Sequence, residues 1–491
     1  MIVGDAARLV IPELGRLRGK AGRFRGLRLI HTHLHGEDLT QDDLSDLALL
    51  RLDLIAAVQV EGEAEGIPGA IEIAHILPGM EAASDSVEPF RRIRARDIYN
   101  LDFDCESQIR ALENEFSRMA GKRRGERGKE RALIIGVSPD QESVEETQEL
   151  AKSAGVETVG VISQRGRKIH PATVVGRGKL QQIVLEGMRR GADVVIFDID
   201  LKPAQARAFE DTTGLKAVDR TQLILDIFAQ RAQSGDGKLQ VELAQLKYSL
   251  PRLTDKDAGL SRLTGGIGGR GPGETVLEIG RRRTYDRIRS LERKIEQLSR
   301  QRGVCRQRRR REGLPTLSII GYTNAGKSTL LNALTESNIR AADKMFVTLD
   351  PTSRRLRFPR EGEVIITDTV GFIRDLPRDL LAAFRATLEE LSDADLLFHV
   401  VDASDPLANR KMDAVVKVLE NLGLCEIPRL VVLNKSDLVD QAQLKSLCRR
   451  LDGIAVSALK REGLETLIDA AEKALERKAF SPERPALQKP L

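Results

Sequence analysis

The 491-residue sequence predicts an α/β multidomain protein whose C-terminal domain contains a mostly parallel sheet. Strand-like apolar runs alternate with amphipathic helical runs between residues 132 and 230, and the same alternation returns between residues 313 and 478. Between these regions lie two long helical patterns with leucine or isoleucine on one face, which predict a helical hairpin. An α+β domain is expected to precede all of them.

Basic and polar stretches between these patterns set the expected boundaries. In order, we expect an N-terminal α+β domain over residues 1–115, a basic linker over 116–131, a small α/β domain over 132–230, an antiparallel helical hairpin over 231–300, a second basic linker over 301–312, a nucleotide domain over 313–478 and a tail over 479–491.

Composition limits the classes of protein that the chain can belong to. No run approaches the ~20 apolar residues of a membrane span, and the four cysteines form no C-x-x-C pair. We therefore expect a cytoplasmic protein with reduced cysteines. A monomer is also expected. Residues 281–312 hold 14 Arg and Lys against 4 Asp and Glu, so this block alone carries +10. Such a block predicts an anionic partner such as RNA, although a solvated helix face followed by a charged linker remains an alternative.

The N-terminal region brings histidines and carboxylates close together in the sequence. A strand-like run ends at His31-Thr32-His33, and a helix with acidic residues in its first turn follows at Asp42 and Asp43. Alternate residues of a strand face one side, so both histidines could bind a metal with either aspartate. The pattern resembles the metal site of JAMM/MPN-type metalloproteases, but no proline follows His33 and the spacing is about one residue short. An interaction domain is the favoured interpretation, and a metal-binding relic or a hydrolase stays open.

The predicted hairpin combines a leucine pattern with a glycine-rich connection. Its apolar positions are Leu239, Leu243, Leu246 and Leu250 on one helix and Tyr285, Ile288, Leu291, Ile295 and Leu298 on the other. The connection, residues 265–274, is expected to project from the tip with Arg262 and Arg270 and to enter an RNA site; a flexible loop is the alternative. Upstream, Gly176 to Lys179 lacks the spacing of a phosphate loop and is interpreted as a turn.

Residues 321–329 have the pattern of a phosphate-binding loop between a buried strand and an amphipathic helix. Their backbone N–H groups can surround phosphates at the N-terminus of the helix. Lys327 is expected to reach phosphate oxygens and Ser328 to bind Mg²⁺. The predicted nucleotide contacts here are Gly321, Tyr322, Thr323, Asn324, Ala325, Gly326, Lys327, Ser328 and Thr329.

Two later motifs are expected to complete the phosphate and metal site. Thr348 is placed to complete Mg²⁺ coordination, with Asp368 holding the ion through water and the Gly371 N–H sensing the γ-phosphate. Lys327, Thr348 and Gly371 are the candidate catalytic residues, and Ser328, Thr348 and Asp368 are the candidate Mg²⁺ ligands. The remaining predicted contacts in these motifs are Phe346, Val347, Thr369 and Val370.

Two further motifs indicate which base is bound. The Asp437 carboxylate can accept two N–H bonds from guanine, a pattern that adenine does not offer. Its motif also includes Asn434 and Lys435, and a backbone N–H from Ser457, Ala458 or Leu459 can reach guanine O6. Five motifs in order, each at a strand end, predict a guanine-specific P-loop GTPase that binds GTP and GDP.

Two residues make the expected hydrolysis more specific. Phe372 stands where many signalling GTPases place a water-orienting glutamine, so hydrolysis is expected to be slow until a partner stimulates it. Asn324 matches an asparagine with which potassium-activated GTPases hold K⁺ beside the phosphates, so K⁺ is a candidate cofactor beside Mg²⁺.

Residues 132–478 resemble the HflX family of ribosome-associated GTPases, within the TRAFAC class. The most specific matches lie outside the GTP motifs, in residues 219–232, 237–248 and 265–274. The resemblance implies binding at the large ribosomal subunit and its RNA, and GTP-dependent separation of stalled or idle ribosomes under stress. Val276 and Gly280 depart from the family pattern.

The RNA contacts that this resemblance implies are at the hairpin, with Arg262, Arg270, Arg281, Arg282 and Arg283 as the candidates. The expected location is the cytoplasm, with association with ribosomes or with the membrane surface as two open alternatives. A second interpretation is an RNA-binding or RNA-remodelling module in which the GTPase domain is only regulatory and the upstream domain acts with ATP or without nucleotide.

Overall fold

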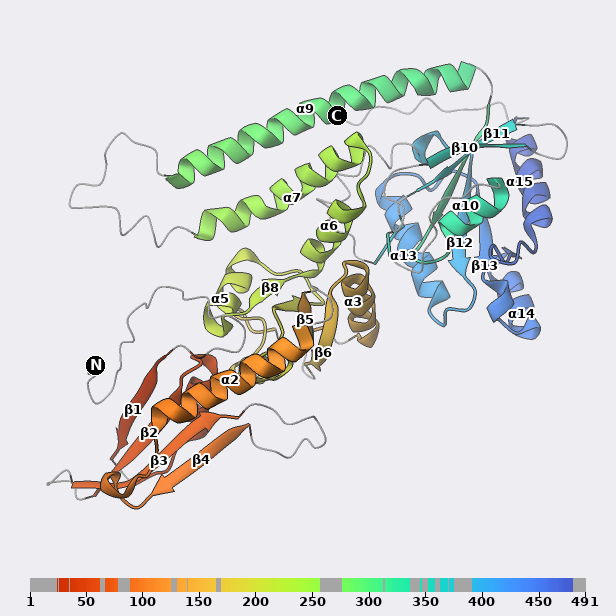
Figure 1. Cartoon of the computed structure of the whole chain (residues 1–491). Helices are drawn as coiled ribbons and strands as arrows, with labels where there is room; N and C mark the ends of the chain where they lie inside the picture. Colours follow the sequence, from red (N-terminus) through yellow and green to blue (C-terminus); the bar gives the residue numbers. More distant parts are fainter. Residues whose placement is uncertain are drawn as a thin grey trace. The chain divides into compact units, whose positions relative to one another are not determined.

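The chain divides into two compact units, Met1–Arg220 and Thr221–Leu491, in the computed structural model (Figure 1). The structure describes residues 24, 26–34, 36–61, 67–77, 89–124, 130–138, 140–164, 169–256, 276–311, 314–335, 345–346, 352–357, 363–369, 371–374 and 391–479.

The first unit begins with a mixed sheet in the strand order β1-β2-β3-β4. Strand β1 (Arg28–His33) runs parallel to β2 (Leu54–Glu61), and helix α1 (Gln41–Leu49) connects them. Strands β3 (Ile67–Ile76) and β4 (Phe90–Ala95) add antiparallel pairs. Strand β4 was not predicted from the sequence, because its three arginines obscure the apolar alternation. Charged residues of this kind are typical of a sheet edge.

A second sheet in this unit is entirely parallel, in the order β6-β5-β7-β8. Its elements alternate along the chain: β5 (Arg131–Gly136), α3 (Gln141–Ser153), β6 (Glu157–Ser163), α4 (Arg177–Arg190), β7 (Val194–Phe197), α5 (Pro203–Thr213) and β8 (Lys216–Val218). Strands β5 and β7 lie in the middle and are almost wholly buried, as both faces of a parallel sheet are covered. This confirms the predicted small α/β layer.

Helix packing joins the two sheets of the first unit. Ser45 of α1 donates a hydrogen bond to Gln181 Oε1 of α4 at 2.9 Å, and Arg177 pairs with Asp46 at 2.7 Å. Leu185 of α4 lies in the hydrophobic core of the first sheet. Burial of an apolar side chain contributes about 1.5–3 kcal/mol, so these contacts hold the two sheets in one unit.

The expected linker over residues 116–131 is partly wrong. Helix α2 (Cys105–Arg124) includes its first nine positions, 116–124. The reason is that Arg, Lys, Met and Ala are all good helix formers, and a single glycine within a helix costs only about 1 kcal/mol. The basic composition of residues 116–124 is therefore compatible with a helix.

The predicted hairpin is formed by α7 (Gly235–Lys256) and α9 (Val276–Arg311), which lie side by side; helix α6 (Arg220–Arg231) precedes them (Figure 1). Glu242 of α7 binds Arg287 of α9 through two bonds of 2.7 and 2.9 Å. A shared apolar cluster comprises Leu239, Leu243, Leu246, Leu250, Ile288, Leu291 and Ile295. Tyr285 and Leu298, which the sequence also placed on this stripe, do not join the cluster, and Tyr285 is 40% exposed.

Two other predictions concern the segments next to the hairpin. The second expected linker, residues 301–312, is helical up to Arg311, again because arginine and glutamine favour a helix. Arg281, Arg282 and Arg283 are exposed on α9. The glycine-rich connection at 265–274, with Arg262 and Arg270, lies outside the described residues.

The nucleotide domain contains a six-stranded sheet in the order β10-β11-β9-β12-β13-β14 among the described residues. Its strands are β9 (Thr316–Gly321), β10 (Thr352–Arg357), β11 (Glu363–Asp368), β12 (Leu396–Asp402), β13 (Arg429–Asn434) and β14 (Gly453–Ala455). Only β10 is antiparallel to its neighbour. The helices in the described part of this domain are α10 (Lys327–Thr335), α13 (Ala408–Asn421), α14 (Gln441–Leu451) and α15 (Leu464–Ala479). The mostly parallel sheet is thus confirmed.

Candidate nucleotide-binding site

The loop between β9 and α10 depends on two glycines. Gly321 has φ of +152°, and a Cβ there would lie 2.3 Å from the Val400 carbonyl oxygen. Gly326 has φ of +88°, and its Cβ would lie 2.3 Å from Asn434 Nδ2. Any side chain would therefore displace the backbone or a neighbouring side chain. These glycines let the loop turn directly into α10, whose N-terminal N–H groups can bind an anion.

Lys327, in the first turn of α10, is a buried cation. Its Nζ donates to the carbonyl oxygens of Gly321 at 3.1 Å and Tyr322 at 2.7 Å. Burial lowers the pKa of Lys327 to about 8, and the nearby Asp368 opposes that shift. A phosphate oxyanion beside this ammonium group would restore the preference for the charged form.

A pair of oxygen atoms next to the loop fits a hard cation. The Ser328 hydroxyl donates to Asp368 Oδ2 at 2.8 Å, and Asp368 is buried at the end of β11. Oxygen donors of this kind suit Mg²⁺, which keeps several of its waters and takes few protein ligands. Thr348, the third predicted ligand, and Val347 and Val370 lie outside the described residues.

The segment after β11 is hydrogen-bonded to the start of the phosphate loop. Thr323 N donates to the Phe372 carbonyl at 2.7 Å, and Phe372 N donates to the Gly321 carbonyl at 3.1 Å. A Cβ on Gly371 would lie 3.0 Å from Lys327 Nζ. Phe372 is 2% exposed, so its ring belongs to the core and supplies no polar group to a water molecule. Phe346 is likewise buried, and its ring packs against the ring of Phe228 with 4.7 Å between the ring centroids.

The proposed base-binding residues are connected to each other and to the phosphate loop. Asn434 Nδ2 donates to the Ala325 carbonyl at 2.8 Å, and Asn434 Oδ1 accepts from Ala458 N at 3.0 Å. Asp437 accepts from the Ser457 hydroxyl at 2.7 Å, and this hydrogen bond is the main reason that the pKa of Asp437 is lowered. Asn434 therefore bridges the phosphate loop and the segment after β14. Asp437, whose pKa is lowered, offers an ionised carboxylate next to that bridge.

Several residues that were not predicted from the sequence line the same region. Asp402, at the end of β12, pairs with Lys435 at 2.7 Å. Its position at the end of a central parallel strand was a usable signal. A hollow beside the loop is lined by Tyr322, Asn324, His399, Asp402, Asp405 and Lys411, among others. Burial, with Arg429 and Lys327 nearby, lowers the pKa of His399 to about 4, so this imidazole is neutral at neutral pH.

Comparison with known proteins identifies the family to which the chain belongs. Residues 141–229, 231–309 and 316–435 match, in that order, the families described as GTP-binding GTPase N-terminal, GTP-binding GTPase Middle Region and 50S ribosome-binding GTPase. The chain is 49% identical over 352 residues to the GTPase HflX of Caldanaerobacter subterraneus, covering 71% of this chain and 81% of that protein. The chain belongs to the HflX family of GTPases.

Other HflX proteins show the same extent of similarity. Identity is 44% over 360 residues to the GTPase HflX of Lacrimispora saccharolytica, covering 72% of this chain and 85% of the relative. It is 47% over 315 residues to that of Escherichia coli, covering 63% and 74%. A solved GTP-binding protein from Sulfolobus solfataricus in complex with GDP is 26% identical, with a TM-score of 0.41, covering 71% of this chain and 99% of that one.

Membership in the HflX family establishes a GTP-binding enzyme that hydrolyses GTP. GTPases of this family generally use Mg²⁺, and Ser328 and Asp368 are the described residues that could hold it. Among the described residues, no helix has the length and apolar character needed to span a membrane. The three matched regions begin at residue 141, so the sheet β1–β4 lies ahead of all of them.

Proposed function

We propose that this HflX GTPase binds the large ribosomal subunit in the cytoplasm and uses GTP to separate stalled or idle ribosomes under stress. The observation that carries the proposal is the match of residues 316–435 to the 50S ribosome-binding GTPases. The exposed arginines of α9 support it, because a cluster of cations suits the phosphate backbone of RNA. The long apolar-seamed hairpin would supply a stiff support for that surface.

The site residues are proposed to divide the work of GTP binding among three groups. Lys327 and the backbone of residues 321–329 bind the phosphates; Ser328, Asp368 and Thr348 hold Mg²⁺; and Asp437 selects guanine. Bound Mg²⁺ supplies neutralisation of charge on the β- and γ-phosphate oxygens. Gly371, where an added Cβ would lie 3.0 Å from Lys327 Nζ, is proposed to report the presence of the γ-phosphate to the segment that follows it.

Hydrolysis is predicted to be slow in the free protein and to rise when ribosomes are added. The buried Phe372 ring cannot orient water, and catalytic groups supplied by a partner are worth about 10³–10⁵ in rate. Asn324, with φ of +63° at the turn of the phosphate loop, is proposed to help hold K⁺. Phosphate release measured with and without large subunits, in K⁺ and in Na⁺, tests both ideas. Fast turnover by the free protein refutes the first, and equal rates in the two salts refute the second.

Separation of ribosomal subunits tests the function directly. With vacant ribosomes on sucrose gradients, we expect the GTP-bound protein to increase the fraction of free subunits, and ATP to have no effect. A non-hydrolysable GTP analogue shows whether binding alone is sufficient. If no nucleotide produces separation while the protein still binds ribosomal RNA, the regulatory RNA-binding interpretation replaces this one.

A further inference from the structure

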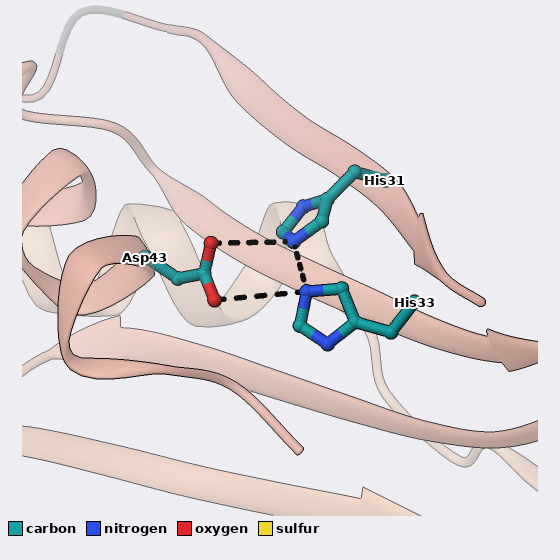
Figure 2. Close-up of side chains that lie close together, drawn as sticks. All are labelled: His31, His33 and Asp43. Carbon is teal, nitrogen blue, oxygen red and sulfur yellow. Dashed lines mark hydrogen bonds and ion pairs between the residues drawn. The ribbon is translucent and has the colours of Figure 1, made fainter. Parts of the chain in front are cut away.

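A second polar cluster lies in the first unit, ahead of the three regions that match the family models. Strand β1 places His31 and His33 on one face, and the first turn of α1 brings Asp43 against them (Figure 2). The two Nε2 atoms are 2.8 Å apart. Asp43 lies 3.3 Å from His31 Nε2 and 3.7 Å from His33 Nε2. One possible ligand atom from each residue lies within 4.8 Å of the others.

Surrounding bonds orient these groups toward a common point. His33 Nδ1 is 2.9 Å from the Glu37 carbonyl oxygen; because a carbonyl only accepts, Nδ1 carries the proton and Nε2 has the free electron pair. Asp43 Oδ2 accepts from the Thr40 hydroxyl at 2.7 Å and from Thr40 N at 2.8 Å. These bonds leave Oδ1 facing His31. A hydrogen bond that fixes the tautomer of a histidine is a common feature behind metal ligands.

The structure also distinguishes between the two aspartates that the sequence left open. The Asp42 side chain is 81% exposed and faces Arg177 at 3.4 Å, so it is not part of the cluster. Asp43 is 19% exposed, with His31 at 26% and His33 at 13%. The cluster is therefore largely covered but retains a path to solvent.

We propose that His31, His33 and Asp43 bind one divalent transition-metal ion of the Zn²⁺ class. Two imidazole nitrogens and one carboxylate oxygen are suitable donors, and a tetrahedral ion bound at 2.0–2.1 Å needs nitrogens about 3.3 Å apart. The two Nε2 atoms would have to move about 0.5 Å further apart to make room for the ion. Three protein ligands leave one coordination position for water, as in zinc sites that are not fully closed. Mg²⁺ is disfavoured because it prefers oxygen donors.

Metal analysis of the full-length, untagged chain tests this site. After treatment with chelator, dialysis against Zn²⁺ and desalting, we expect one Zn²⁺ per chain for the wild type, and loss of this ion in His33→Gln and Asp43→Asn. His170→Gln is the matched control, since His170 is an exposed histidine of the same unit outside the cluster. GTP binding should be unchanged in all variants, which separates this proposal from the proposed function. Equal Zn²⁺ content in the wild type and both variants overturns the site.

A measurement on the wild type keeps the test decisive if a variant does not fold. Zn²⁺ should protect His31 from acylation by diethyl pyrocarbonate, as read by peptide mass spectrometry, and leave His170 reactive. Co²⁺ in place of Zn²⁺ should produce a visible absorption band typical of mixed nitrogen and oxygen ligands. Reaction of His31 at the same rate with and without Zn²⁺ refutes the proposal.

Discussion

The Asp437→Asn variant should bind xanthosine triphosphate in preference to GTP. Guanine presents an N1–H and an exocyclic amino group to the carboxylate, and an amide cannot accept both bonds. Xanthine has a carbonyl in place of the amino group, which an asparagine Nδ2 can bind while its oxygen still accepts from N1–H. A site that is built for particular hydrogen bonds rejects a ligand lacking them by roughly 10⁴-fold or more, so both a large loss and a large gain are expected.

Nucleotide titrations with the variant and the wild type measure this exchange. Asp437 is already ionised and held by Ser457, and the amide oxygen that the substitution introduces can keep that bond, so the loop should stay intact. Asp440→Asn is the matched control: the same chemical change three positions along, at the N-cap of α14. If Asp437→Asn keeps the GTP affinity of the wild type, Asp437 does not read the base.

The Lys327→Met variant should lose most of its affinity for GTP. Methionine has a similar length and an apolar side chain, but it lacks the ammonium group with which Lys327 would contact the phosphates. Removing one member of a buried hydrogen-bonded charge pair costs about 2–5 kcal/mol, which corresponds to a loss of roughly 30-fold to several thousand-fold. Without GTP, the variant should be no less stable than the wild type, because burial of the ammonium group is unfavourable and already lowers its pKa.

The same lysine predicts a dependence of binding on pH. Its pKa is about 8 in the protein without nucleotide, and bound phosphates favour the charged form. Binding therefore takes up a proton above that pH, and GTP affinity should decline as the pH rises further. Guanine itself ionises in alkaline solution, so Lys327→Met supplies the reference curve. Lys417→Met, on the exposed face of α13, should match the wild type. Identical pH curves for Lys327→Met and the wild type contradict this role.

Local patterns were sufficient for most of the fold. The parallel layer of the first unit and the sheet of the nucleotide domain were predictable because buried parallel strands are continuous apolar runs between helices. The failures came from basic segments. Residues 116–124 and 301–311 looked like linkers, yet both are helical. Charge indicates exposure to water, but it does not distinguish an exposed helix from an extended chain, since Arg and Lys also favour helix.

The candidate nucleotide site was predictable in outline but not in its connections. The order of the motifs indicated that Ser328 and Asp368 would approach each other, and they lie 2.8 Å apart. No pattern along the chain indicated that Asn434 would bridge Ala325 and Ala458. That bridge depends on β13 lying next to β12 in the sheet, which is a matter of strand order.

By itself, the sequence determined the P-loop, the guanine-specific motifs and the HflX resemblance, because each depends on residue types at short, constant spacing. Tertiary structure alone decided which carboxylate joins His31 and His33. Asp42 and Asp43 are adjacent and chemically alike, but the capping of α1 by Thr40 turns Asp43 to the histidines and Asp42 to solvent and Arg177. The direction of a side chain on a helix is set by where the helix begins and what it packs against, and neither is written in the two residues themselves.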